Sequence, residues 1–198
     1  MKMQEQKILG LSLFTFQASD ELTSSALAAV KKEQFENTAA NLITKAADLH
    51  TKPEFQELHE WFDQCLATVN QRVGYPFPKL EIILSWANLT ETGFEHHFHM
   101  HNNSLVSGVF YLTEGKGGET YFSDNVNLWK RNLFFLYGED RESAELAAKR
   151  GRLVVFPSNL RHGVRLNLDD EPRYSIAFNA FPKGSWGGVV QKNKIVVN

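Results

Sequence analysis

The histidines are the residues of this sequence whose types and spacing most clearly suggest chemistry. Four of the seven lie in the short segment 95–101 (EHHFHMH). Residues i and i+2 of a β-strand point to the same face, so His99 and His101 can direct their imidazoles at one point, and His97 shares that face. Imidazole nitrogen binds Fe, Zn, Ni and Cu alike, so the pair indicates a metal without naming it. The alternative is a solvated polar strand.

A third candidate ligand, His162, lies far along the chain. It follows the apolar run 152–157 (RLVVFP), which is typical of a buried strand, and a short turn. A lone histidine beside a turn is usually structural, but the first pair lacks a third ligand. We therefore expect His99, His101 and His162 to meet at one metal ion.

Arg173 and Ser175 are candidates for binding an anion. They begin an apolar strand, and its period of two places them on one face. The guanidinium fork matches a carboxylate in two parallel hydrogen bonds, and a serine hydroxyl on the same face adds another. The pair therefore suggests a carboxylate clamp. The alternative is an edge-strand arginine paired with a neighbouring acidic residue at 169–171.

Helical spacing dominates the first part of the chain, after an apolar opening strand at 7–16. Ser19 and Asp20 can cap a helix in which apolar residues recur at three- and four-residue steps over 21–50, with an interruption at 33–38. A second helix is expected after Thr51, because Thr51 and Glu54 form a capping-box pattern with Pro53 near the first turn, and Gly74 ends it.

The chain beyond Pro78 changes to short β-rich runs separated by turn residues. About eight strands fit a jelly-roll-like barrel. The expected strands are 80–88, 95–101, 107–112, 119–123, 133–137, 152–157, 163–166 and 174–181, with a short helical turn at 143–150. We expect one domain over 1–198, made of an N-terminal strand and supporting helices (1–78), a β core (79–182) and a C-terminal extension (183–198).

Composition excludes several classes of protein. The chain has 198 residues and a formal net charge of -2, with 42% hydrophobic and 22% charged residues, as in ordinary globular proteins. The charge favours no nucleic-acid partner, and no apolar run reaches the roughly 18 residues of a membrane helix. Cys65, the single cysteine, lies on the apolar stripe of a predicted helix and is expected to be a buried structural thiol. A cytoplasmic location is expected, and a homodimer is left open.

The segment 80–181 resembles the Fe(II)/2-oxoglutarate-dependent oxygenases. The closest likeness is to a family of such oxygenases with a histidine pair followed by Ser-Gly-Val-x-Tyr, and it extends to prolyl hydroxylases. The elements that carry it are 99–101 (HMH), 107–111 (SGVFY), 117–122 (GGETYF), the run from Phe156 to His162, and Arg173-x-Ser175.

The resemblance implies an α+β, mainly β fold, a double-stranded β-helix (jelly roll) with the N-terminal helices packed outside. It also implies oxidative decarboxylation of 2-oxoglutarate by O2, coupled to hydroxylation of an unidentified small molecule or peptide. The site residues that it assigns are His99, His101 and His162 for Fe(II), Arg173 and Ser175 for the far carboxylate of 2-oxoglutarate, and, with less support, Tyr111 and Asn88 for the same cosubstrate.

One departure from the oxygenase pattern concerns the metal ligands. Most of these oxygenases have Asp or Glu where this chain has His101. A carboxylate could still come from Glu95, Glu119 or Asp124, or His97 could replace one of the three histidines.

A second resemblance is to cupins, through the glycine and histidine spacing of their two motifs (Gly93 to His101 and Gly151 to Pro157). The cupin glutamate is missing, because positions 105 and 106 are Leu105 and Val106, and Asn159 stands in place of a glycine. The alternatives are therefore a cupin-like dioxygenase or isomerase that does not use 2-oxoglutarate, and a non-catalytic metal-binding β-sandwich.

The primary substrate cannot be read from the sequence, because nothing in 125–131 or 138–142 names a ligand. The tryptophans suit core or rim packing better than a substrate cage; they are Trp61, Trp86, Trp129 and Trp186.

Overall fold

The computed structural model describes residues 2–8, 11–38, 41–123, 143–186 and 195–197. Two α-helices and short 3-10 turns accompany the strands. In chain order the elements are β1 (Met3–Ile8), β2 (Leu11–Gln17), α1 (Asp20–Val30), β3 (Phe35–Asn37), β4 (Leu42–Thr44), η1 (Leu49–Thr51), η2 (Pro53–Phe55), α2 (Gln56–Val73), β5 (Lys79–Thr90), β6 (His96–His99), β7 (Val106–Tyr111), β8 (Thr120–Ser123), β9 (Ser143–Leu146), β10 (Arg152–Pro157), β11 (Arg161–Val164), β12 (Arg173–Trp186) and β13 (Ile195–Val197).

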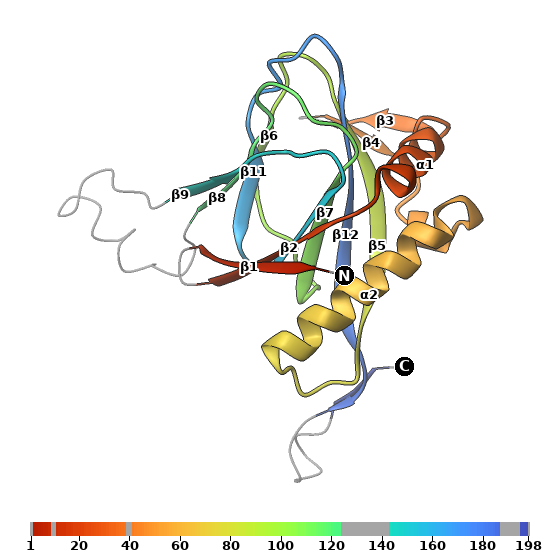
Figure 1. Cartoon of the computed structure of the whole chain (residues 1–198), viewed down its shortest axis with the longest axis vertical. Helices are drawn as coiled ribbons and strands as arrows, with labels where there is room; N and C mark the ends of the chain where they lie inside the picture. Colours follow the sequence, from red (N-terminus) through yellow and green to blue (C-terminus); the bar gives the residue numbers. More distant parts are fainter. Residues whose placement is uncertain (1, 9–10, 39–40, 124–142, 187–194, 198) are drawn as a thin grey trace, which may run out of the picture.

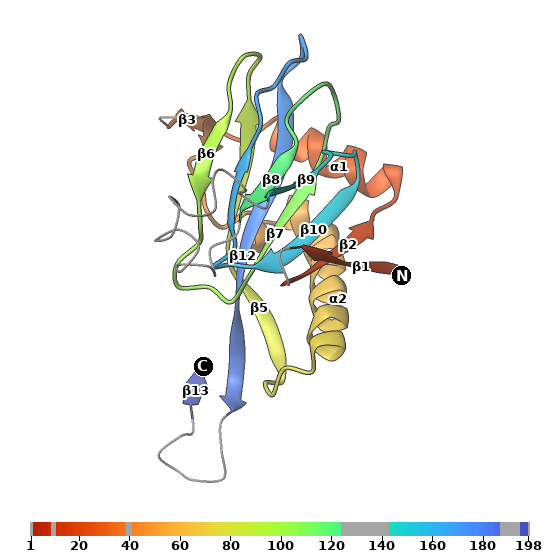
Figure 2. The same cartoon turned by 90° about the vertical axis from the view of Figure 1, so that its left-hand side faces the viewer.

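The strands form two sheets that face each other (Figures 1 and 2). The larger sheet has the order β1-β2-β10-β7-β12-β5-β4-β3, with β13 paired to the end of β12, and the smaller sheet has the order β6-β11-β8-β9. This arrangement is the double-stranded β-helix that the sequence predicts. Strands from the first 78 residues, β1 to β4, complete both ends of the larger sheet.

Side-chain alternation along β12 shows how the larger sheet separates its two faces. Ser175 and Ala177 line a pocket on the inner face, whereas Ile176 and Phe178 belong to the apolar core on the outer face. Because successive side chains of a strand point to opposite faces, one apolar run supplies both the core and the site.

Helices α1 and α2 cover the outer face of the larger sheet (Figure 1), as expected. Phe62 of α2 packs against Phe110 and Phe178 of the sheet, with ring centroids 5.6 Å and 5.0 Å away. Burial of such a ring contributes about 1.5–3 kcal/mol. Cys65 is also fully buried there, and burial raises the pKa of its thiol to about 12, so it is a structural thiol as predicted. The helices therefore act as scaffold.

The structure corrects the predicted elements of the N-terminal part. The opening strand is a hairpin, because β1 and β2 pair antiparallel. The helix expected over 21–50 ends at Val30, and the residues that follow form β3 and β4 at the edge of the larger sheet. Leu42 and Ile43 pair with Leu89 and Asn88 of β5. Sheet pairing thus outweighs the helical spacing of the apolar residues, which is only a weak signal.

The predicted capping box at Thr51 is also wrong, although the helix after it exists. The Thr51 hydroxyl donates to the carbonyl of Asp48, and a 3-10 turn at Pro53–Phe55 precedes α2. The N-cap residue of α2 is Phe55, whose side chain makes no capping hydrogen bond. At the other end Gly74 adopts the left-handed conformation that terminates a helix, as expected.

The segment expected as a helical turn at 143–150 begins instead with strand β9, which pairs with β8. Its pattern is that of a strand, since Leu146 packs inward while Glu145 bonds Arg165 outside. The expected strand 133–137 and the candidate substrate segments 125–131 and 138–142 lie outside the described residues.

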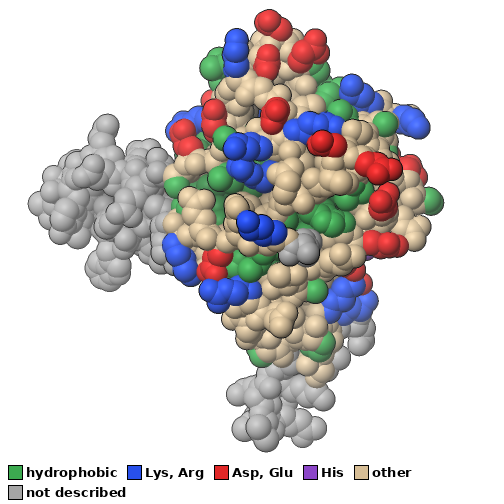
Figure 3. Space-filling view, in the orientation of Figure 1, with side chains coloured by type: hydrophobic (Ala, Val, Ile, Leu, Met, Phe, Trp, Pro, Cys, Tyr) green, Lys and Arg blue, Asp and Glu red, His purple; other side chains and the backbone are tan. Residues whose placement is uncertain are grey.

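The surface agrees with the modest net charge. On the face shown in Figure 3, basic and acidic side chains are interspersed, so that face presents no field of one sign to a polyanion. Among the described residues, no helix combines the length and apolar character that crossing a membrane requires.

Candidate metal centre

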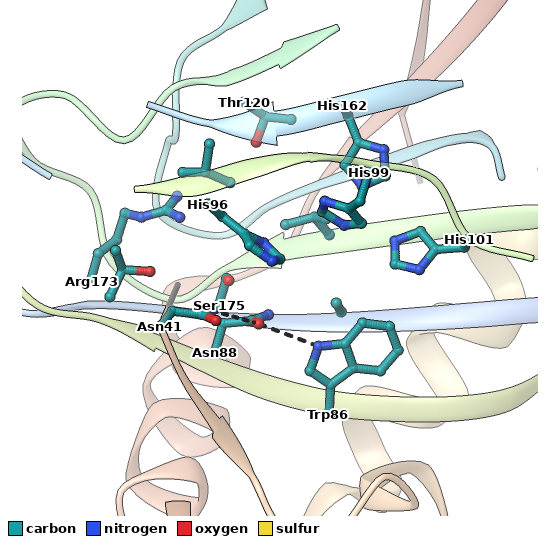
Figure 4. Close-up of a pocket in the computed structure, with 14 residues that line it drawn as sticks. Asn41, Trp86, Asn88, His96, His99, His101, Thr120, His162, Arg173 and Ser175 are labelled. Atoms are coloured by element: carbon teal, nitrogen blue, oxygen red, sulfur yellow. Dashed lines mark hydrogen bonds between the residues drawn. The ribbon is translucent and has the colours of Figure 1, made fainter. Parts of the chain in front are cut away.

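A pocket lined by residues of both sheets brings most of the predicted site residues together (Figure 4), but the predicted cosubstrate contact Tyr111 does not line it. The histidines come from the smaller sheet and its continuation, and Arg173 and Ser175 come from β12 of the larger sheet. In the register of the larger sheet, Ser175 lies opposite both Asn88 and Tyr111. The sheet pairing therefore sets three of the predicted cosubstrate contacts side by side.

His99, His101 and His162 form one cluster. One ring nitrogen of each lies within 4.8 Å of the others. Antiparallel pairing of β6 with β11 sets His99 directly opposite His162, and His101 is held just beyond β6 by a bond from its backbone N–H to the carbonyl of Ser158. Nitrogens this close can converge on one ion, because metal–imidazole bonds are about 2.0–2.2 Å long.

Hydrogen bonds orient two of these rings. Nδ1 of His99 lies 2.9 Å from the carbonyl oxygen of His97, and Nδ1 of His162 lies 2.9 Å from that of Leu160. A carbonyl only accepts, so each Nδ1 carries the proton and each Nε2 keeps a free lone pair. This tautomer leaves Nε2 of both rings free to bind a metal.

A fourth histidine lies in the pocket, and it is His96 rather than His97. Between the pairs His162–His99 and Val164–His96, β11 advances two residues (162 to 164) while β6 spans three (99 to 96). This bulge breaks the alternation of β6, so His96 faces the pocket beside His99 while His97 is exposed. The expectation that His97 shares the ligand face is therefore wrong.

The described donors of the cluster are all imidazoles. Of the residues expected to offer a carboxylate, Glu95 is exposed and neither Glu95 nor Glu119 lines the pocket, while Asp124 lies outside the described residues. No other acidic residue of the described chain lines it. The pocket is thus rich in neutral nitrogen and contains one cation, Arg173.

Burial keeps these imidazoles neutral. It lowers the pKa of His162 to about 3 and those of His101 and His96 to about 4, and it lowers the pKa of His99 in the same direction. Metal binding requires the deprotonated ring. The cluster is therefore ready to bind a cation at any physiological pH.

The same burial predicts that the metal-free protein loses stability in mild acid. Below pH 6.5 the unfolded chain protonates His162, whereas the folded chain, with a pKa of about 3, does not. Unfolding is therefore favoured as pH falls, by about 2 kcal/mol at pH 5 for this one residue. Urea unfolding of metal-free protein at about pH 7 and about pH 5 should show the loss. Between these two pH values the His162→Asn variant should lose less free energy of unfolding than wild type. An equal loss in both proteins would contradict this explanation.

Arg173 lies at the other end of the pocket (Figure 4) and is only 6% exposed. Its Nη1 donates to the carbonyl of Gly118 over 2.9 Å, but its Nε is buried without a partner. Among the described residues it forms no ion pair, so the alternative of pairing with 169–171 is not realised. A buried guanidinium with an unused donor is what a carboxylate ligand would complete.

Gly118 explains part of the Gly-Gly motif. Its φ of +69° is left-handed, and a Cβ there would approach the Arg173 side chain to 2.9 Å. Only glycine leaves this room. Thr120, two residues on, bonds the hydroxyl of Tyr111 over 2.6 Å and so links the two sheets at the pocket wall.

Asn88 has a neighbour that the sequence did not reveal. Its Oδ1 accepts from Nε1 of Trp86 (3.3 Å) and from Nδ2 of Asn41 (3.1 Å). These bonds turn the amide of Asn88 so that its own Nδ2 is left to donate. Asn41 lies just before β4, in the part expected to be helical, so no sequence signal placed it in the pocket.

Residues 84–179 match the model of a family described as "Putative 2OG-Fe(II) oxygenase". Over these residues, slightly under half of the chain, the sequence is similar to the 2OG-Fe(II) oxygenases. The match decides between the two resemblances in favour of the oxygenases over the cupins. It also names Fe(II) and 2-oxoglutarate as the family's metal and cosubstrate. In the described part of the chain, the cluster of His99, His101 and His162 is the one group that could hold that metal.

Solved structures of other enzymes have the same fold. HygX from Streptomyces hygroscopicus, with nickel and 2-oxoglutarate bound, gives a TM-score of 0.66 at 15% identity over 86% of this chain and 82% of HygX. A Pseudomonas putida prolyl-4-hydroxylase gives 0.60 at 18% identity over 87% of this chain and 93% of the hydroxylase. The carbocyclase SnoK from nogalamycin biosynthesis gives 0.67 at 14% identity over 91% and 84%. A search of curated protein sequences gives no match.

The residues of this pocket fit both Fe(II) and 2-oxoglutarate. Three imidazole nitrogens suit Fe(II), and the partnerless Nε of Arg173 suits an anionic carboxylate in the same pocket.

Proposed function

We propose that this oxygenase is a hydroxylase that uses Fe(II), O2 and 2-oxoglutarate to oxidise a C–H bond of a small molecule or peptide. The observation that carries the proposal is the pairing, within one pocket, of a three-histidine cluster with a buried arginine that lacks an anionic partner. A ligand that chelates a metal through one end and carries a carboxylate at the other requires a pocket of this kind, with a metal site at one end and a cation at the other.

The histidines would hold the metal through their free nitrogens. For His99 and His162 that atom is Nε2, because Nδ1 is engaged with a backbone carbonyl. The backbone bonds also fix each ring plane before metal arrives, which lowers the entropy cost of binding. His101 has Trp86 beside it, at a ring-centroid distance of 5.6 Å, which limits its rotation.

Arg173 and Ser175 would hold the far carboxylate of 2-oxoglutarate. Both side chains are buried on the inner face of β12, and no hydrogen bond of the Ser175 hydroxyl to another described residue competes with a ligand. Asn88 would add its free Nδ2 from the neighbouring strand. Tyr111 would support Arg173 rather than contact the cosubstrate itself, because its hydroxyl is bonded to Thr120 and its ring lies 5.9 Å from the guanidinium carbon of Arg173.

When bound, Fe(II) and 2-oxoglutarate supply activation of O2: the cosubstrate becomes succinate and CO2, and one oxygen atom enters the substrate C–H bond. The protein's part is to position these groups and exclude water, for which Val109, Val164 and Ala177 give the pocket apolar walls. Fold neighbours include a hydroxylase and a carbocyclase, so the fold alone leaves the outcome open. Hydroxylation is the outcome that requires no second reacting group.

The proposed activity is tested by incubating the protein with Fe(II) and 2-oxoglutarate in air and measuring succinate. Slow turnover without primary substrate is expected to depend on all three components. A His99→Ala/His101→Ala double variant is the control, because it keeps the rest of the pocket. Succinate at the level of the iron-only blank, or equal amounts from both proteins, would count against the proposal.

A further inference from the structure

His96 is a pocket residue to which neither the motifs nor the metal cluster gives a role. Its ring centroid lies 4.4 Å from that of His99, and it lines the pocket with the three cluster histidines. It is not a member of the cluster, since the group of converging nitrogens comprises the other three. Its presence in the pocket results from the β6 bulge. Bulges next to active sites commonly re-aim a side chain.

The position of His96 between the two ends of the pocket suggests what it contacts. Figure 4 shows its ring between Arg173 and the cluster. Of the four pocket histidines, His96 is also the one whose pKa is affected by the charge of Arg173. A ligand that extends from the metal cluster to Arg173 therefore passes beside this ring.

His96 also has hydrogen-bonding capacity to offer. Both ring nitrogens of His96 lack a hydrogen-bond partner among the described residues. In His99 and His162, by contrast, one ring nitrogen is hydrogen-bonded to a backbone carbonyl. A neutral imidazole presents one N–H donor and one acceptor. A partly buried ring with an unused donor gains from an anionic oxygen within reach.

We propose that His96 is a cosubstrate-binding residue that donates a hydrogen bond to a carboxylate oxygen of 2-oxoglutarate. The inference rests on the proposed use of 2-oxoglutarate by this site. His96 then completes, from the smaller sheet, a set of polar contacts that otherwise comes from the larger sheet. No proton or electron is transferred, because the residue acts only by binding.

The chain provides a matched control in His97, an adjacent histidine on the exposed side of the same strand. The test is equilibrium binding of 2-oxoglutarate to protein loaded with Ni(II), which imidazole also binds and which performs no turnover. His96→Ala is expected to weaken binding by about 10- to 100-fold, the value of one hydrogen bond to a charged group. His96→Gln, which keeps an N–H donor, should recover part of it, and His97→Ala should match wild type.

Metal affinity, measured separately, distinguishes this role from others. It should be unchanged in His96→Ala, and a parallel loss of Ni(II) would make His96 a metal ligand and overturn the proposal. Equal 2-oxoglutarate affinity in His96→Ala and wild type, or an equal loss in His97→Ala, would also overturn it. Binding of 2-oxoglutarate to the wild-type Ni(II) protein is measured before the variants. If the wild-type protein binds none, the proposed function is wrong, and this outcome is distinct from a failure of the role proposed for His96.

Discussion

Arg173→Ala is expected to abolish binding of 2-oxoglutarate at ordinary concentrations while leaving the metal in place. Arg173 is buried, its Nε has no partner, and no carboxylate lines the pocket in the described part of the chain. Removing one partner of a buried, hydrogen-bonded charge pair costs about 2–5 kcal/mol, or roughly 30- to 5,000-fold in affinity. Calorimetric titration of metal-loaded protein measures the change.

Two further variants serve as controls for Arg173→Ala. Arg173→Lys keeps the charge but loses the fork, so its affinity should fall between those of wild type and Arg173→Ala. Arg165→Ala removes an arginine that is paired with Glu145 outside the pocket, and it should bind like wild type. If Arg173→Ala bound 2-oxoglutarate as tightly as wild type, the carboxylate clamp would be wrong.

Loss of His162 is expected to have the second large effect, on the metal. Changes to residues that merely orient metal ligands cost about 10- to 100-fold in affinity, so removing a ligand should cost at least about 100-fold. The same change leaves the carbonyl of Leu160 without its ring partner, a cost to folding of only about 1–3 kcal/mol. Metal content after dialysis and the urea midpoint separate the two effects.

His59→Ala provides the control for His162→Ala, because His59 is a partly buried histidine on α2, away from the cluster. It should retain metal at the wild-type level. Retention of metal by His162→Ala would place the third ligand elsewhere, and equal losses of metal and of folded protein would mean that the residue is structural.

The site could be predicted from the sequence where a short-range rule applied without interruption. The spacing of His99 and His101 and of Arg173 and Ser175 follows strand alternation, and the structure places all four in one pocket. The rule failed at His96 and His97, because a bulge in β6 shifts the alternation and nothing in the local sequence marks it. Identifying His96 required knowing which residues of β11 face it.

The fold was predictable at the level of its elements, and less so at its edges. The jelly-roll strands and the helix ending at Gly74 follow from apolar periodicity and turn residues. The region after Val30 did not, because Leu42 and Ile43 are recruited by pairing with a strand more than forty positions later. That pairing delivers Asn41 to the pocket, so one error of secondary structure hid one residue of the site.

Anaerobic optical titration can test whether the three histidines hold Fe(II) while Arg173 anchors 2-oxoglutarate beside it. Chelation of Fe(II) by a 2-oxo acid gives a metal-to-ligand charge-transfer band in the visible range. The band should appear on adding 2-oxoglutarate to Fe(II)-loaded protein and saturate at one equivalent per chain. It should be absent for His162→Ala and need far more 2-oxoglutarate for Arg173→Ala. Wild-type protein that holds Fe(II) yet gives no band at saturating 2-oxoglutarate would show that the cosubstrate does not bind to the metal in this site.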